Sequence, residues 1–375
     1  MTQLIQAVGT MSGTSMDGVD VALIETDGQT QVRAVPGASH TISYSNAERD
    51  VLFKAVDTAL HIDAPEAVSH PDLIAAADIS TVRHIQALQI LLGRLEKPVD
   101  VIGYHGQTVL HRPNPLDPAL AFTVQLGDAE RLTRETGVTT VYDFRSADVT
   151  AGGQGAPLAP LYHQALLTST AELPAIILNL GGIANITFVP DADPENLIAA
   201  DIGPANVFMD DLVRTETGKA YDEEGALAAS GAVDTLLVEQ FFSAPYFQEA
   251  GPKSLDRYGL EAPDVSALGL ADAMATLAEL TIESVVRAIG GLPQPPKAVF
   301  VAGGGVKNTY LMAQMQARLA SPVLPLNDLG FSAAMLEAEA FAYLAARHLK
   351  GLPITFPSTT GVHAPMLGGK RIRSA

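Results

Sequence analysis

The sequence contains no cysteine, so disulfides and thiolate metal sites are excluded. It also lacks long hydrophobic runs, because none reaches the roughly 20 residues that a membrane-spanning helix needs. The N-terminus has neither the basic segment nor the long apolar core of a signal peptide. These absences predict a soluble cytoplasmic protein with no membrane partner.

Positive charge is scarce as well. The chain carries 23 Lys and Arg against 42 Asp and Glu, which gives a formal net charge of −19. Such a balance argues against a surface for nucleic acid or anionic lipid. A phosphate-containing ligand would therefore need local compensation from Mg²⁺, lysine or arginine.

Hydrophobic residues make up 47% of the chain, and its 375 residues exceed the size at which a single core stops growing. Two domains are therefore expected. Strand-like and helix-like patterns alternate, and a hairpin with a glycine turn occurs twice, at Leu4 to Ile24 and at Ile176 to Val189. This recurrence predicts two similar α/β halves with a cleft between them.

Short apolar runs bounded by turn residues predict strands at 4–8, 19–24, 31–36, 99–104, 122–126, 139–142, 175–180, 184–189, 197–200 and 298–302. Helical spacing of apolar residues predicts helices at 46–60, 72–95 (as one or two helices), 128–135, 160–167, 208–217, 268–289, 309–319 and 331–349. Ser45 is expected to cap the first of these helices.

A polar, hydroxyl-rich turn near the N-terminus, Thr10 to Asp20, separates two predicted strands. Its glycines permit backbone angles that other residues avoid, and successive N–H groups in such a turn can form an anion site. Asp17 and Asp20 suit a phosphate site only if a divalent cation binds with the phosphates. The alternative is an ordinary hairpin turn, in which these residue types are common.

Two further glycine turns follow predicted strands. They are Gly181-Gly182, paired with the stretch Asp201 to Asn206, and Gly303 to Gly305. Ligands of open α/β sheets collect at strand ends and helix N-termini. None of the turns matches the Walker pattern or the dinucleotide fingerprint, which disfavours a P-loop NTPase and a Rossmann dehydrogenase.

Motifs along the whole chain resemble those of the anhydro-N-acetylmuramic acid kinase family. The opening segment Gly9 to Asp20 resembles the signature with which that family begins. The further matching motifs are Gly103-Tyr104-His105-Gly106-Gln107-Thr108, Asp143-Phe144-Arg145, Gly152-Gly153-Gln154-Gly155-Ala156-Pro157-Leu158, Asn179-Leu180-Gly181-Gly182-Ile183-Ala184-Asn185, Asp201-Ile202-Gly203-Pro204-Ala205-Asn206, Gly303-Gly304-Gly305 and Glu337-Ala338-Glu339-Ala340-Phe341. Together these motifs are specific, although no single one is.

The resemblance implies an α/β fold of the actin and hexokinase type, with two domains that close on a nucleotide. One domain would comprise residues 1–127 and 329–375, and the other residues 128–328. The resemblance further implies that water opens the 1,6-anhydro ring of anhydro-N-acetylmuramic acid and that O6 takes the γ-phosphoryl group of ATP. The product would be N-acetylmuramate 6-phosphate, formed in the recycling of the cell wall.

The resemblance also assigns roles to single residues. Asp201 would be the catalytic base, a role that suits a carboxylate at an oxocarbenium-like centre; the alternative is an N-cap or turn residue. His105 and Gln107 would contact sugar hydroxyls, and Arg145 would hold the lactyl carboxylate. ATP would be bound, with Mg²⁺ whose ligands are unassigned, by Gly13, Thr14, Ser15, Met16, Asp17, Gly18, Val19, Asp20, Gly203, Gly303 and Gly304.

Some positions depart from the family pattern. Ile202 stands where the family has threonine, so a hydroxyl is lost. Ala205 stands where the family has glycine, so the range of backbone angles allowed at this position is narrower. The family's Pro-Lys-Ser-Thr-Gly becomes Pro-Lys-Ser-Leu-Asp at 252–256, and Ala334 replaces an aspartate. These changes leave Asp201 and the first turn intact.

Two other functions remain open from the residues. One is a sugar kinase of the same fold that acts on an open hexose. The other is a nucleotide-switched binding or filament protein of the actin type. The family resemblance points to a homodimer and to ATP and the anhydro sugar as partners.

Overall fold

The computed structural model describes residues 4–62, 69–114, 116–248, 255 and 260–374. The chain divides into two compact units, residues 1–169 with 335–375 and residues 170–334. The first boundary thus lies beyond the predicted position at residue 128. The reason is that Thr140–Tyr142 pairs with Ile102–Tyr104 in the sheet of the first unit.

The first unit contains a mixed sheet with the strand order β12-β6-β4-β1-β2-β3, to which β5 is added by pairing with β4. The strands are β1 (Ile5–Ser12), β2 (Gly18–Thr26), β3 (Val32–Ser43), β4 (Val101–Arg112), β5 (Phe122–Leu126), β6 (Thr140–Tyr142) and β12 (Lys370–Ile372). The helices are α1 (Asn46–Ala59), α2 (Pro71–Leu92), α3 (Ala129–Thr136), α4 (Ser146–Thr150), α5 (Pro160–Thr170), α11 (Leu336–Leu349) and α12 (Pro357–Thr360).

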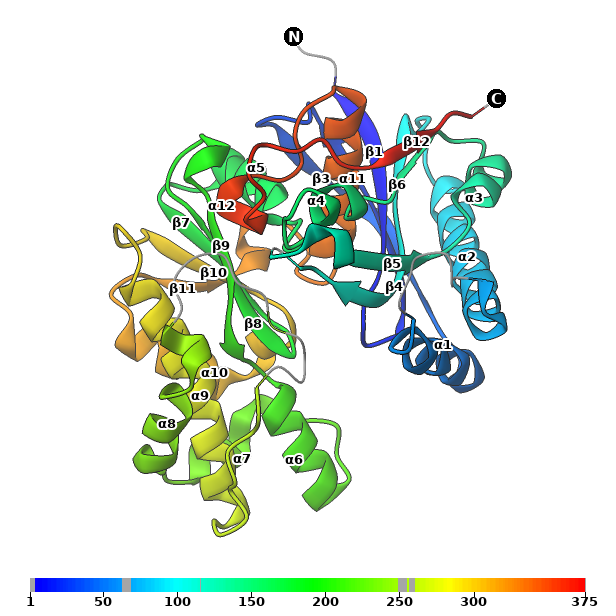
Figure 1. Ribbon diagram of the computed structural model, residues 1–375. Helices are drawn as coiled ribbons and strands as arrows, with labels where there is room; N and C mark the ends of the chain where they lie inside the picture. The colour runs from blue at the N-terminus through cyan, green and yellow to red at the C-terminus, as the bar shows by residue number, and fades with distance from the viewer. Residues whose placement is uncertain (1–3, 63–68, 115, 249–254, 256–259, 375) are drawn as a thin grey trace. The chain divides into compact units, whose positions relative to one another are not determined.

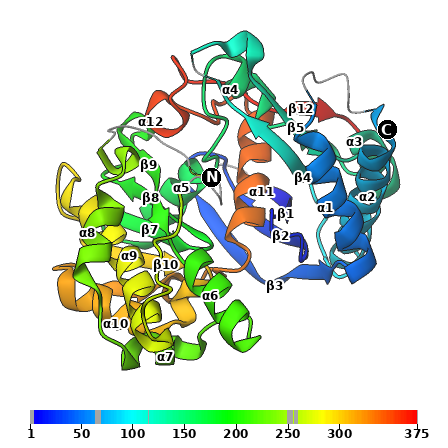
Figure 2. The same ribbon diagram turned by 60° about the horizontal axis from the view of Figure 1, so that its bottom comes forward.

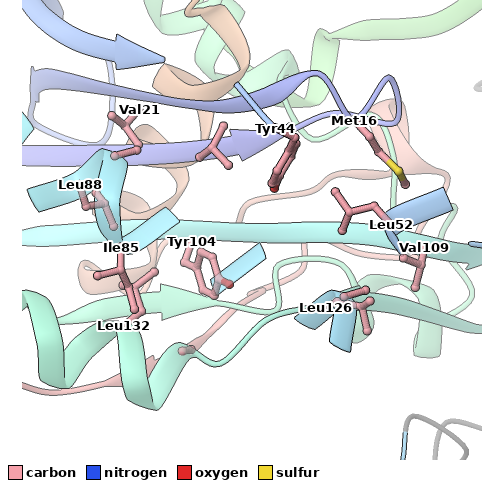
Figure 3. Close-up of a cluster of buried hydrophobic side chains, with 14 of the residues drawn as sticks. Met16, Val21, Tyr44, Leu52, Ile85, Leu88, Tyr104, Val109, Leu126 and Leu132 are labelled. Carbon is pink, nitrogen blue, oxygen red and sulfur yellow. The ribbon is translucent and has the colours of Figure 1, made fainter. Parts of the chain in front are cut away.

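Helices cover both faces of this sheet, with α1, α2 and α3 on one face and α11 on the other (Figures 1 and 2). Successive side chains of a strand point to opposite faces. Val8 and Ile102 accordingly join the core cluster beneath α1 and α2, part of which Figure 3 shows. Their neighbours Gly9 and Gly103 face α11, whose backbone approaches so closely that a Cβ on either glycine would overlap it.

The second unit contains a five-stranded sheet with the order β11-β10-β7-β8-β9. Its strands are β7 (Ala175–Leu180), β8 (Ile183–Val189), β9 (Ile198–Pro204), β10 (Ala298–Ala302) and β11 (Val323–Pro325). Its helices are α6 (Val207–Thr217), α7 (Ala226–Ser230), α8 (Thr235–Phe242), α9 (Leu270–Gly290) and α10 (Thr309–Arg318). A separate core forms around α9 and the sheet.

The two sheets repeat one topology. In the first unit β1, β2 and β3 are antiparallel neighbours, while β4 and then β6 add in parallel on the other side of β1. In the second unit β7, β8 and β9 pair antiparallel, while β10 and then β11 add in parallel beside β7. The predicted duplication of an α/β unit, and the actin and hexokinase type of fold, are thereby confirmed. In the part of the chain that the structure describes, no helix is long and apolar enough to span a bilayer.

Candidate active site

The polar turn of the first unit spans residues 13–17, because β1 runs on to Ser12 and β2 begins at Gly18. Thr14, Ser15 and Asp17 are exposed, whereas Met16 is buried with a positive φ of 51°. The Met16 side chain points into the hydrophobic cluster that Figure 3 shows. One buried methionine thus anchors a turn whose polar side chains face solvent.

Three hydrogen bonds hold the backbone of this turn. The Gly13 carbonyl accepts hydrogen bonds from Met16 N (3.1 Å) and from Gln107 Nε2 (3.2 Å). Tyr44 N donates to the Asp17 carbonyl (3.0 Å). The Thr10 hydroxyl, at the base of the turn, is buried and has no hydrogen-bond partner among the described residues. A ligand oxygen would satisfy this hydroxyl, since buried polar groups normally find a partner.

Two carboxylates accompany the turn. Asp17 Oδ1 accepts a hydrogen bond from Ser15 Oγ (2.9 Å), and Asp20 Oδ1 accepts one from Thr41 Oγ1 (2.5 Å). Burial raises the pKa of Asp20, and the Asp17 charge adds to this, against the bond from Thr41. No group of three potential metal ligands occurs in the described residues. The donors present suit Mg²⁺ that keeps phosphate and water oxygens as most of its ligands.

His105 and Arg145 contact each other in the first unit. Arg145 Nη2 and Nε lie 3.1 and 3.3 Å from His105 Nε2, and Arg145 Nη1 donates to the Gly155 carbonyl (2.8 Å). Burial and the Arg145 charge place the pKa of His105 well below its ordinary value. The imidazole is therefore neutral at physiological pH. Burial lowers the pKa of Arg145 to about 10, so the guanidinium stays charged.

Acidic groups surround this arginine. Glu337 and Asp148 both favour the charged form of Arg145. Desolvation by the surrounding protein raises the pKa of the Glu337 carboxyl, although the residue is exposed. The charge of Arg145 opposes this rise, whereas the charges of Asp20 and Asp17 add to it. The sequence favoured a solvated helix face for Glu337. The structure confirms that Glu337 is exposed on α11, and its charge also interacts with Arg145, Asp20 and Asp17.

Asp201 lies in β9 of the second unit, at a break in the register between β8 and β9. Its carboxylate Oδ2 accepts a hydrogen bond from Leu255 N (2.6 Å), and its carbonyl accepts one from Tyr246 Oη (2.7 Å). It is a strand residue rather than the N-cap of α6, for which Asn206 occupies that position. The remainder of the motif at 252–256 lies outside the described residues.

The three predicted glycine segments of the second unit meet. Ala205 N and Asn206 N donate to the carbonyls of Gly182 and Gly181. A Cβ added to Gly303, where φ is 81°, would lie 2.6 Å from the Leu180 carbonyl oxygen. Only glycine fits this approach between the strand end and the turn.

A pocket of about 170 Å³ lies beside these segments, lined by Asn206, Met209, Asp210, Tyr221, Asp222, Glu224, Gly304, Lys307 and Asn308. Gly304 is one of the predicted nucleotide residues, whereas Asn206 and Tyr221 were not singled out. The pocket combines an exposed aromatic ring, a lysine and amide groups. These are suitable groups for a heteroaromatic base with its sugar.

The two departures next to Asp201 have small structural consequences. Ile202 points into the core of the second unit, on the face of β9 opposite to its neighbours. Ala205 is buried and is not among the described residues with positive φ. Its carbonyl accepts a hydrogen bond from Thr281 Oγ1 (2.8 Å). The backbone of this motif therefore accommodates alanine without strain.

Known proteins match the chain along almost its whole length. The model of the family described as anhydro-N-acetylmuramic acid kinase matches residues 5–372. The chain belongs to the anhydro-N-acetylmuramic acid kinase family. It is 45% identical over 368 residues to the anhydro-N-acetylmuramic acid kinase of Zymomonas mobilis, which covers 97% of this chain and 98% of that protein. The corresponding protein of Rhizorhabdus wittichii is 45% identical over 372 residues, 98% of this chain and 99% of its own. The chain is thus a phosphotransferase with an alcohol group as acceptor.

Proposed function

We propose that this enzyme opens the 1,6-anhydro ring of anhydro-N-acetylmuramic acid with water and phosphorylates O6 from ATP, giving N-acetylmuramate 6-phosphate and ADP for cell-wall recycling. The observation that supports this reaction best is the position of Asp201. Its carboxylate sits at the irregular part of β9 and is oriented by Leu255 N within a motif that the family match covers.

In the proposed reaction Asp201 accepts a proton from the water that attacks C1. The C1–O6 bond breaks through an oxocarbenium-like state. O6 then takes the γ-phosphoryl group as ADP leaves, so no general acid is needed to protonate O6.

The polar turn at 13–17 is proposed to hold the ATP phosphates through its backbone N–H groups and the hydroxyls of Thr14 and Ser15. Residues of this segment up to Asp20 belong to the same proposed site. Asp17 and Asp20 are the groups that would hold Mg²⁺, which neutralises phosphate charge when bound. Gly203, Gly303 and Gly304 are proposed to accommodate the nucleoside beside the pocket of the second unit.

Arg145 is proposed to bind the lactyl carboxylate of the sugar. Three of its N–H bonds point to His105 and Gly155, which leaves one N–H on each terminal nitrogen. Two such N–H groups in one plane match a carboxylate in a bidentate pair. The half-buried position of Arg145 strengthens this pair because water competes less for it than at an exposed site.

Substrate selection tests the proposal. The protein would be incubated with ATP, Mg²⁺ and one of four sugars: anhydro-N-acetylmuramic acid, its analogue without the lactyl group, N-acetylglucosamine or glucose. We expect rapid ADP formation with the first, slower formation with the second and background rates with the open hexoses. Phosphorylation of glucose at a comparable rate, with the anhydro sugar inert, would contradict it. The homodimer stays a prediction that light scattering can measure.

A further inference from the structure

We propose that His105 and Gln107 are positioning residues: His105 fixes the guanidinium of Arg145, and Gln107 fixes the turn at residues 13–17. Both were expected to contact sugar hydroxyls. This inference rests on the proposed function and concerns how its two binding groups are held in place.

Gln107 has little capacity left for a ligand. Its side chain is fully buried. The amide nitrogen Nε2 donates to the carbonyls of Gly13 and Thr108, both at 3.2 Å. Its oxygen Oε1 accepts a hydrogen bond from Ser12 Oγ at 2.5 Å. Both N–H bonds of the amide are therefore used, and a sugar hydroxyl finds no donor there.

These bonds join β4 to the end of β1 and the start of the turn. Ser12 Oγ also lies 3.2 Å from Tyr44 Oη, and Tyr44 N holds the Asp17 carbonyl at the other end of the turn. Gln107 and Tyr44 thus hold the two ends of the turn by hydrogen bonds to the Gly13 and Asp17 carbonyls. Loss of the Gln107 amide would leave the Gly13 carbonyl with Met16 N as its partner and the Ser12 hydroxyl with Tyr44 Oη, so each group would lose one of its two hydrogen bonds.

His105 is held in one tautomer. Its Nδ1 lies 2.9 Å from the Gly106 carbonyl and must carry the proton, because a carbonyl only accepts. Nε2 is then an acceptor and receives the N–H bonds of Arg145. The ring packs on Phe341 with a centroid separation of 4.5 Å, and the residue is 4% exposed.

The other side of the guanidinium is fixed by a relay from Asp148. This buried carboxylate accepts hydrogen bonds from Gly155 N (2.7 Å) and Thr360 Oγ1 (2.6 Å). The Gly155 carbonyl in turn accepts from Arg145. The imidazole and this carbonyl together fix the plane of the guanidinium and direct its remaining N–H bonds.

One pair of variants separates positioning from direct contact. Gln107→Met keeps the length of the side chain and removes its hydrogen bonds. We expect roughly tenfold weaker binding of a non-hydrolysable ATP analogue and an unchanged affinity for the anhydro sugar, both measured by calorimetry. Ser12→Ala removes one of the same bonds and should weaken analogue binding in the same direction. Gln6→Met at the start of β1, whose amide binds Glu25 and lies outside this network, is the matched control.

His105→Phe keeps an aromatic ring against Phe341 and removes the acceptor, whereas His105→Gln keeps an acceptor. We expect the KM for the sugar to rise roughly tenfold in the first variant and to recover in part in the second, with the KM for ATP unchanged in both. Loss of sugar binding in Gln107→Met with normal binding of the ATP analogue would overturn the inference and restore direct contact. An inactive wild type with the anhydro sugar would instead reject the proposed function, while the calorimetry with the analogue still tests the role of Gln107.

Discussion

The two units share a strand order, yet their first hairpins end in different ways. In the first unit the turn at 13–17 leaves hydroxyls and a carboxylate exposed, and Gln107 Nε2 holds its backbone by a hydrogen bond to the Gly13 carbonyl. In the second unit the carbonyls of the Gly181-Gly182 turn are bonded to the segment that begins α6, and Asn206 Nδ2 adds bonds to Leu180 and Gly181.

The comparison shows that the same strand order can carry two different kinds of turn after its first strand. A long turn with small polar residues is available to a ligand, whereas a tight glycine turn is occupied by bonds that shape its own unit. The second unit accordingly presents its candidate chemistry one strand further on, at Asp201 in β9. The turn proposed to bind the ATP phosphates and the residue proposed as the base thus belong to different units.

The largest expected effect tests the contribution of the second unit. Asp201→Asn should lower turnover about 10³-fold or more, because an amide cannot take the proton from the attacking water. Binding of an ATP analogue should stay normal, since the turn of the first unit is untouched. Steady-state kinetics and calorimetry measure both. The exposed Asp264→Asn in the same unit is the control, and near-normal turnover of Asp201→Asn would remove this residue as the base.

The next effect tests how closely α11 lies on the sheet of the first unit, with a helical glycine of the second unit as the control. Gly9→Ala in the first unit should lower the free energy of unfolding by about 3 kcal/mol, because its Cβ would lie 1.8 Å from the Ala338 carbonyl oxygen. Gly290→Ala, at the end of α9 in the second unit, meets nothing within 4 Å and should be neutral or slightly stabilising. Urea unfolding compares the two. Equal stability of both variants would mean that α11 does not lie on β1 as described.

The third prediction concerns a pH effect in the first unit. Burial raises the pKa of Glu339 to about 7, although the bond from Tyr162 Oη opposes the rise. The folded state therefore holds this proton more tightly than the unfolded state. Its contribution to stability is complete below about pH 4.5 and is lost as pH rises through 7, by about 3 kcal/mol at most.

Glu339→Gln should remove that part of the pH dependence and raise the melting temperature at pH 8. Differential scanning calorimetry from pH 5 to 8 measures it, with the exposed Glu216→Gln of the second unit as control. A wild-type melting temperature that follows the same pH profile as Glu339→Gln would show that Glu339 titrates normally.

The smallest expected effect concerns Arg145. Arg145→Lys keeps the positive charge but loses the planar pair of N–H groups. We expect a roughly tenfold rise in the KM for the sugar and little change in kcat or in the KM for ATP. The analogue without the lactyl group should bind the variant and the wild type equally. A large difference between the two proteins with that analogue would show that Arg145 serves another group.

Much of the fold could be predicted from local pattern. The strand at 298–302 and the cap of α1 by Ser45 were both confirmed, because apolar runs and capping residues act over a few positions. Several elements differed from their predicted bounds, and β4 and α11 are two examples. β4 continues to Arg112 because Gly106, with φ at 72°, carries the strand through an irregular register. α11 begins at Leu336, five residues after the predicted start.

The site was only partly visible in the sequence. Residue types showed which groups could do the chemistry, but side-chain partners depend on contacts between distant segments. The burial of Gln107 against Ser12, 95 positions away, left no local signal. The same holds for the bond between Asp148 and Thr360. The exposure of Glu337 was predicted correctly, but its charged neighbours, Arg145, Asp20 and Asp17, come from distant segments and could not be read from the local pattern.

The central claim is that water enters the sugar at C1 while O6 takes the phosphoryl group. Reaction in ¹⁸O-labelled water, quenched early and followed by NMR and mass spectrometry, tests it most directly, with preformed product kept in the same water to correct for exchange at C1. We expect one ¹⁸O atom at C1 of the sugar phosphate and none in the transferred phosphoryl group. Label in the phosphoryl group, or a phosphorylated product whose anhydro ring is intact, would contradict the account.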